Sequence, residues 1–147
     1  MSDAVLNLLA YLYGRETVEK IGGKVGVKYN KAGRVKYVYI DGKPAFVLRN
    51  NDGYLLPTTY GATFLSKKVV ISQEVVRYVK EGRNVPAKYI IDITPHVRPY
   101  GEVAVFSPTG ELVAVGRLLY SIRELSLGRG YAVRTRLVNK KTSPRES

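Results

Sequence analysis

The chain has 147 residues, of which 45% are hydrophobic and 24% charged, a composition that supports one mid-sized globular domain or two small ones. It contains no cysteine, which excludes disulfides, thiolate metal sites and a cysteine nucleophile. It contains one histidine, His96. A zinc site with several histidine ligands is therefore excluded, and a Ser-His pair has a single candidate. We therefore expect no catalysis, no metal and no cofactor, and a cytoplasmic location.

Positive charge is the strongest feature of the composition. The chain has 24 Lys and Arg against 12 Asp and Glu, a formal net charge of +12, and its pI is about 9.9. Such a charge favours polyanionic partners, and nucleic acid is the first to consider. The excess is uneven, since residues 1–66 carry a net +4 and residues 67–147 a net +8. The 12 tyrosines supply rings that pack in a core or stack on bases.

Residues 3–21 carry apolar side chains at helical spacing, and Gly14 divides this segment into two predicted helices. The longest apolar run, residues 4–13, contains Asn7 and is too short to cross a bilayer. It also lacks the basic leader of an exported chain. We therefore expect no membrane association.

After Gly22 the apolar period changes to two, which predicts a small antiparallel sheet. Asp41-Gly42 is typical of a type I′ turn between two of its strands. Thr58 is a predicted cap for a short helix over residues 58–65. The predicted strands are residues 24–29, 34–40, 44–48 and 54–56.

We place a domain boundary between residues 66 and 67, where the composition changes without a long linker. The second domain begins with a predicted strand and then a helix capped by Ser72, whose buried stripe is Val75, Val76 and Val79. Residues 118–127 are ambiguous, since their apolar spacing allows a strand end followed by a short helix. Residues 139–147 form a polar, frayed tail. The predicted strands of this domain are residues 69–71, 88–93, 102–106, 111–116 and 131–138.

Six segments of the second half form a familiar set: Val69-Val70-Ile71, Val79-Lys80-Glu81-Gly82-Arg83-Asn84-Val85, Ala87-Lys88-Tyr89-Ile90, Arg98-Pro99-Tyr100-Gly101-Glu102-Val103, Ala114-Val115-Gly116-Arg117 and Gly128-Arg129-Gly130-Tyr131-Ala132-Val133. They resemble the PUA domain, an RNA-binding domain named for pseudouridine synthases and archaeosine transglycosylases. The resemblance implies a β pseudobarrel over residues 67–138.

Residues 34–39, residues 48–54 and Gly61-Ala62 look like the small α/β domain that precedes the PUA domain in archaeal tRNA-guanine transglycosylase and archaeosine synthase. The resemblance implies an α+β fold in which this domain comes first and the pseudobarrel second. One departure is Pro86, where the transglycosylases tend to have an aromatic residue. The catalytic barrel of those enzymes, with its aspartates and zinc site, does not fit in this chain.

The last predicted strand supplies two candidate RNA-binding residues. Because side chains alternate along a strand, Arg134 and Arg136 are expected on one face, roughly 6 to 7 Å apart. That is close to the spacing of adjacent phosphates, which a guanidinium can bind through two hydrogen bonds. The alternative is an edge strand that its charges protect from aggregation.

Other candidates come from the helix end and from the basic C-terminal part. The resemblance adds Arg83, Asn84 and Lys88, although Lys80 and Arg83 also suit the negative end of a helix dipole. Gly116, inside a strand, marks a bulge or a close contact. The remaining candidates are the basic residues Arg117, Arg123 and Arg129 and the rings of Tyr120 and Tyr131, which stack on unpaired bases or belong to the core.

We expect an RNA-binding protein, and the resemblance implies that its PUA domain holds the acceptor stem and 3′ end of tRNA. Two alternatives stay open. The chain could be the non-catalytic tRNA-binding subunit of a split tRNA-guanine transglycosylase or archaeosine-forming complex, with catalysis in a separate chain. It could instead be a ribosome-assembly or translation factor that binds ribosomal RNA.

Overall fold

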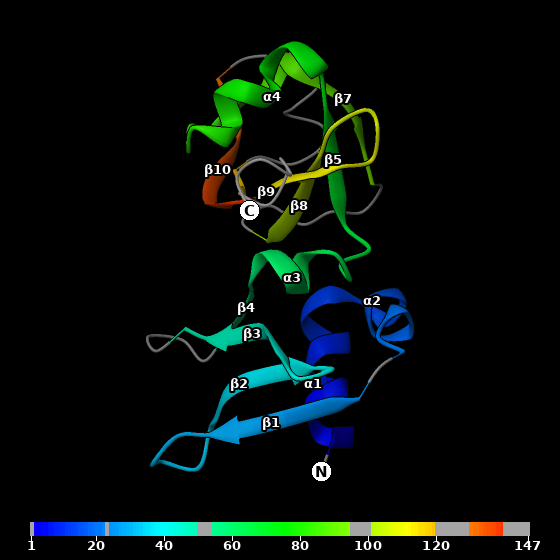
Figure 1. Cartoon of the computed structure of the whole chain (residues 1–147), viewed down its shortest axis with the longest axis vertical. Helices are drawn as coiled ribbons and strands as arrows, with labels where there is room; N and C mark the ends of the chain where they lie inside the picture. Colours follow the sequence, from blue (N-terminus) through cyan, green and yellow to red (C-terminus); the bar gives the residue numbers. More distant parts are fainter. Residues whose placement is uncertain (1, 23, 50–53, 95–100, 120–129, 140–147) are drawn as a thin grey trace. The chain divides into compact units, whose positions relative to one another are not determined.

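The computed structural model describes residues 2–22, 24–49, 54–94, 101–119 and 130–139. The chain divides into two compact units, residues 1–66 and 67–147, and each is described by itself (Figure 1). Within the described ranges, no helix combines the length and the apolar character that crossing a membrane needs. The predicted segments at residues 120–127 and 140–147 lie outside the described residues.

The first unit places helices beside an antiparallel sheet of four strands in the order β1-β2-β3-β4 (Figure 1). All of its predicted helices and strands are confirmed to within a few residues. In the Asp41-Gly42 turn both residues have positive φ, 52° and 81°, as a type I′ turn requires. The elements are α1 (Ser2–Tyr13), α2 (Arg15–Lys20), β1 (Val25–Tyr29), β2 (Val35–Ile40), β3 (Lys43–Leu48), β4 (Leu55–Pro57) and α3 (Thr59–Ala62).

Helix α1 and the sheet enclose the core of the first unit. The ring of Tyr13 lies 5.6 Å from that of Phe46, and its hydroxyl donates a hydrogen bond to the carbonyl of Leu55. The side chain of Thr58 accepts a hydrogen bond from the Gly61 N–H at 3.0 Å, which confirms the predicted cap. A Cβ on Gly61 would lie 1.9 Å from the carbonyl oxygen of Ala45, so only glycine lets α3 approach β3 this closely.

The second unit is a curled, mixed sheet of the half-barrel kind typical of PUA domains. Its strand order is β6-β10-β9-β8-β5-β7, in which β5 and β8 are parallel and the other neighbours antiparallel. The elements are β5 (Lys68–Ile71), α4 (Gln73–Lys80), β6 (Val85–Pro86), the 3-10 turn η1 (Ala87–Tyr89), β7 (Ile90–Ile93), β8 (Glu102–Phe106), β9 (Leu112–Leu118) and β10 (Tyr131–Val138).

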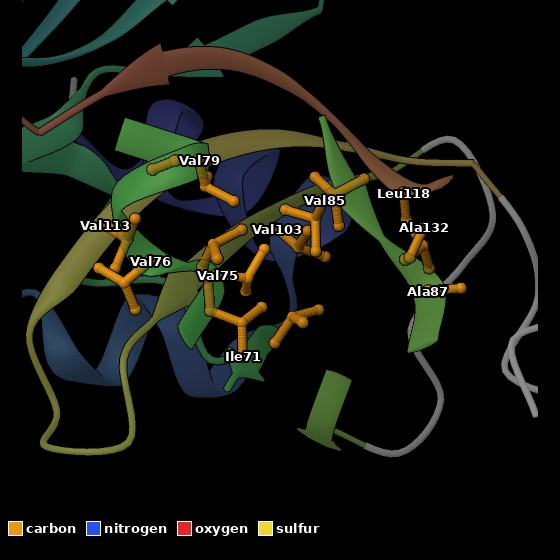
Figure 2. Packing of buried hydrophobic residues seen from close by; sticks show 14 residues of the cluster. Ile71, Val75, Val76, Val79, Val85, Ala87, Val103, Val113, Leu118 and Ala132 are labelled. Carbon is orange, nitrogen blue, oxygen red and sulfur yellow. The ribbon is translucent and has the colours of Figure 1, made fainter. Parts of the chain in front are cut away.

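The core of the second unit lies between α4 and the sheet. Figure 2 shows the predicted stripe of α4, Val75, Val76 and Val79, among valines of the strands such as Val103 and Val113. These side chains are at most 5% exposed, which confirms the stripe. Burial of this apolar surface holds the helix against the sheet.

The second unit differs in four local features from what the sequence predicts. Ser72 occupies the predicted N-cap position of α4, but its side chain makes no capping hydrogen bond. Residues 87–89 form η1 before β7 begins, so the predicted strand over residues 88–93 starts later. The two-residue strand β6 went unpredicted, because Val85 and Pro86 pair only with the distant β10. Ala132 and Val133 are both buried, because register shifts along β10 interrupt the strict alternation of its side chains.

Candidate nucleic-acid interface

The second unit contains a pocket of about 620 Å³ that segments distant in the sequence build together. Helix α4 forms one wall, β6 and η1 form another, and the start of β10 completes it. Because β6 pairs with β10, the strand pairing itself fixes this arrangement. The lining residues are Glu74, Val75, Tyr78, Pro86, Lys88, Tyr89, Gly130 and Tyr131.

Three of the lining side chains are tyrosines, one from each wall. Tyr78 and Tyr89 are half-buried, and Tyr131 is 45% exposed. Tyr78 lies three residues after Val75, so the amphipathic helix that buries its valines carries this ring at the edge of the buried stripe. Tyrosine offers both an apolar ring face and a hydroxyl, which suits a stacked, hydrogen-bonding ligand such as a nucleobase.

The hydroxyls of two pocket tyrosines interact. A hydrogen bond with the Tyr78 side chain is the main cause that raises the pKa of Tyr131, and the Arg83 guanidinium acts in the opposite direction. At neutral pH Tyr131 is therefore uncharged. A neutral phenol can stack on a base and donate a hydrogen bond without repelling a phosphate.

Two cations stand over the pocket rings. The guanidinium of Arg83 lies 5.2 Å from the centroid of Tyr78, and the ammonium of Lys88 lies 5.3 Å from that of Tyr89. The Arg83 Nε is 3.6 Å from Glu81 Oε1, but both side chains are about 60% exposed, so this pair binds weakly. The pocket thus combines aromatic walls with positive charge, as the binding of an unpaired nucleotide requires.

Asn84 is occupied within the fold. Its side-chain oxygen accepts a hydrogen bond from the Thr135 N–H at 3.1 Å, and the Thr135 hydroxyl donates to the Arg83 carbonyl at 2.9 Å. These bonds tie the loop after α4 to β10. Asn84 therefore positions the loop that carries Arg83.

The two arginines predicted to act as a pair are in different situations. Arg134 is exposed and lies opposite Arg117 of β9. Arg136 donates from Nε and Nη2 to Glu102 Oε1 at 3.1 and 2.9 Å, and the Glu102 side chain is only 3% exposed. A buried carboxylate needs this partner, so the expectation of two free guanidinium groups on one face is corrected.

Gly116 confirms the predicted close contact inside a strand. A Cβ at this position would lie 2.3 Å from the carbonyl oxygen of Arg134. The pairing of β9 with β10 shifts register between Thr135 and Leu137, immediately beyond this contact. The glycine lets β10 cross β9 closely where the sheet curls.

The structure brings together only part of the predicted set. Arg83, Lys88 and Tyr131 meet at the pocket, and Arg117 and Arg134 are neighbours in the sheet. Tyr120, Arg123 and Arg129 lie outside the described residues. Tyr78 and Tyr89 were missed, although the tyrosine beside Lys88 and the tyrosine at the edge of the α4 stripe were visible signals.

Family comparisons agree with the two units. Residues 67–138 match the PUA domain, and residues 3–70 match the patch-forming domain C2 of tRNA-guanine transglycosylase. The chain is a PUA-domain protein with a preceding C2 domain. The pocket described above therefore belongs to the PUA domain, a type of domain that binds RNA.

Individual relatives give the same result. The chain is 35% identical to the tRNA-guanine(15) transglycosylase of Methanocaldococcus jannaschii over 143 residues, which cover 88% of this chain and 22% of that enzyme. It spans about a fifth of the length of such curated relatives.

Solved structures share the fold. A conserved PUA domain protein from Thermoplasma acidophilum superposes with a TM-score of 0.70 over 99% of this chain and 93% of its own, at 19% identity. A chain of an H/ACA ribonucleoprotein bound to a substrate RNA reaches a TM-score of 0.51 at 25% identity, over 63% of this chain and 28% of its own. The first of these likenesses establishes the fold over both units.

Proposed function

We propose that this protein binds tRNA and that its PUA pocket takes the unpaired 3′ end. The observation that carries the proposal is the meeting of Tyr78, Tyr89 and Tyr131 in one pocket with Arg83 and Lys88 over the rings. Bases of a single-stranded end stack on the rings, and their phosphates lie near the two cations. Arg117 and Arg134 add positive charge on the adjoining sheet.

The comparisons support RNA as the ligand and tRNA as its class. PUA domains bind RNA, and the relatives that match both units are named as enzymes that act on tRNA. The similar H/ACA chain belongs to a particle bound to a substrate RNA. The described pocket contains no paired carboxylates or histidine, and binding without chemistry is the function that its residues suit.

The test is a salt titration of binding to one tRNA with and without its single-stranded 3′ end. Trimming the end should lower the affinity, and Tyr78→Ala and Tyr89→Ala should each lower it roughly 5- to 100-fold for intact tRNA only. Tyr11→Ala is the matched control, since this tyrosine of α1 is 78% exposed and far from the pocket in sequence. Equal affinity for intact and trimmed tRNA would show that the pocket does not bind the 3′ end.

A second candidate function is presentation of tRNA to a separate catalytic chain in the cytoplasm, for the formation of archaeosine. The order of the two matched domains favours it, since a C2 domain and then a PUA domain match parts of transglycosylases. Copurification with a barrel-type transglycosylase that lacks these domains, and stimulation of its base exchange, would support this function. Sedimentation with ribosomal particles instead would favour the assembly of ribosomes.

A further inference from the structure

Charge in the first unit is segregated onto its sheet. Residues 24–49 hold seven Lys and Arg against one acid, a net +6, whereas the rest of residues 1–66 holds two basic and four acidic residues. The one acid, Asp41, accepts a hydrogen bond from the Lys24 backbone N–H at 2.9 Å. The strands β1 to β3 and their turns therefore carry most of the positive charge of this unit.

Within the part of the chain that the structure describes, the ion pairs lie elsewhere and leave the cations of residues 24–43 unneutralised. These side chains are all exposed. Unpaired lysines that are close together repel one another, and a polyanion relieves this repulsion. The six cations are Lys24, Lys28, Lys31, Arg34, Lys36 and Lys43.

The two faces of the sheet differ. Val38, Ile40 and Phe46 are buried on the face that packs with Tyr13 of α1. Side chains of the opposite phase form a row across the four strands and are half-buried or exposed. We call this outer face the tyrosine platform: Gly26, Lys28, Tyr37, Tyr39, Val47 and Leu56.

Two rings lie side by side on the platform. The ring centroids of Tyr37 and Tyr39 are 6.0 Å apart, and the Lys36 ammonium lies 5.6 Å from the Tyr37 centroid. Gly26 pairs with Tyr39, and a Cβ on this glycine would lie 3.9 Å from the Tyr39 Cβ, on the same face. Because glycine has no side chain, the surface beside Tyr39 stays open to a ligand.

We propose that the tyrosine platform binds a stretch of unpaired RNA, with bases stacked on Tyr37 and Tyr39. Its phosphates are held by Lys28, which is paired with Tyr37 in the sheet, and by Lys36, whose ammonium lies beside the Tyr37 ring. Aromatic side chains on the open face of a four-stranded antiparallel sheet are a common arrangement for stacking successive bases. A protein partner is disfavoured, because lysine is depleted in protein interfaces and five of the six cations are lysines. This surface goes beyond the proposed function, since it belongs to the other unit and shares no residue with the PUA pocket.

The test uses the full chain and a fluorescent circular oligouridine, which has unpaired bases but no 3′ end. Tyr37→Ala and Tyr39→Ala should each weaken binding about 5- to 100-fold, and Tyr37→Phe and Tyr39→Phe should retain it because stacking needs only the ring. Tyr37 and Tyr39 are half-buried, so the melting temperature of each variant is measured alongside.

A second pair of variants avoids the loss of any packed side chain. Gly26→Glu adds a carboxylate beside Tyr39 at a position with room for a Cβ, whereas Gly22→Glu makes the same charge change where nothing lies within 4 Å. Binding of the circular RNA should fall at least tenfold in Gly26→Glu and change little in Gly22→Glu. Equal effects of the two glutamates, or full binding by the alanine variants, would overturn the proposal and leave this face to a protein.

The two proposals can fail separately. If Tyr78→Ala leaves the affinity for intact tRNA unchanged while Tyr37→Ala still loses the circular RNA, the proposed function is wrong and the platform stands. If Tyr78→Ala lowers tRNA affinity and the platform variants bind the circular RNA normally, the platform is wrong and the PUA pocket stands.

Discussion

The sheets of the two units present their polar surfaces in different ways. The four-stranded sheet of the first unit buries one face and leaves a row of tyrosine and lysine side chains on the other. The six-stranded sheet of the second unit curls around its core, and its rings meet in a pocket beside α4. An open sheet can support an extended strand of several nucleotides, whereas a curled sheet and a helix together enclose one or two.

The largest expected effects are losses of stability caused by glycine substitutions, each confined to one of the two units. Gly61→Ala in the first unit and Gly116→Ala in the second each place a Cβ within 2.3 Å of a backbone carbonyl oxygen. We expect each to reduce the free energy of unfolding of its own unit by about 3 kcal/mol or more. Hydrogen exchange, read separately for the two units, measures the effect.

The control for this comparison is Gly22→Ala, since a Cβ on Gly22 would meet nothing within 4 Å. It should leave the exchange rates of both units close to those of the parent protein. Loss of protection in both units from a single glycine substitution would show that they unfold together.

The ion pair between Arg136 and Glu102 has the next largest expected effect. Arg136→Ala leaves the carboxylate of Glu102 buried without this partner, whereas Glu102→Gln leaves an arginine that is 30% exposed and can be hydrated. We expect about 2 to 3 kcal/mol of destabilisation from Arg136→Ala and about 1 kcal/mol from Glu102→Gln. Urea denaturation measures the stability of the two variants. A larger loss in Glu102→Gln than in Arg136→Ala would show that the carboxylate is not the group that depends on the ion pair.

Arg134 provides the matched test of binding. Arg134→Ala should weaken tRNA binding and make the salt dependence shallower by about one phosphate contact, because its side chain is exposed beside Arg117. Arg136→Ala should leave the salt slope unchanged at temperatures where the variant is folded. If Arg134→Ala leaves the salt dependence of tRNA binding unchanged, this part of the sheet does not contact the RNA.

Local signals in the sequence account for most of the fold. Asp41-Gly42 and Thr58 specify a turn and a cap through their own backbone and side-chain chemistry, and both formed as predicted. The pairing of β6 with β10, and of Arg136 with Glu102, joins residues more than thirty positions apart. Such contacts depend on how the sheet curls, which no local pattern encodes.

The same limit explains what was predicted of the pocket. Arg83, Lys88 and Tyr131 were identified singly, as basic or aromatic residues in a PUA-like segment. That they meet over Tyr78 and Tyr89 depends on the packing of α4 beside η1 and β10. The assignment of Arg136 was the weakest, because a charge in a sequence does not reveal whether a buried acid binds it.

The smallest expected effect concerns the pKa of Tyr131. Because the folded-state pKa is raised above the ordinary value of 10.0, the hydrogen bond with Tyr78 contributes stability below pH 10 and loses it as the pH rises through the folded pKa. Tyr78→Phe removes the main cause and should lower the pKa of Tyr131, whereas Arg83→Ala removes the opposing charge and should raise it. NMR titration of the Tyr131 ring measures both. Opposite shifts of the pKa in the two variants would show that the Tyr78 hydroxyl and the Arg83 guanidinium both act on Tyr131. A phosphate bound by Arg83 should then raise the pKa of Tyr131 by offsetting the positive charge, so the pKa would report whether the pocket is occupied.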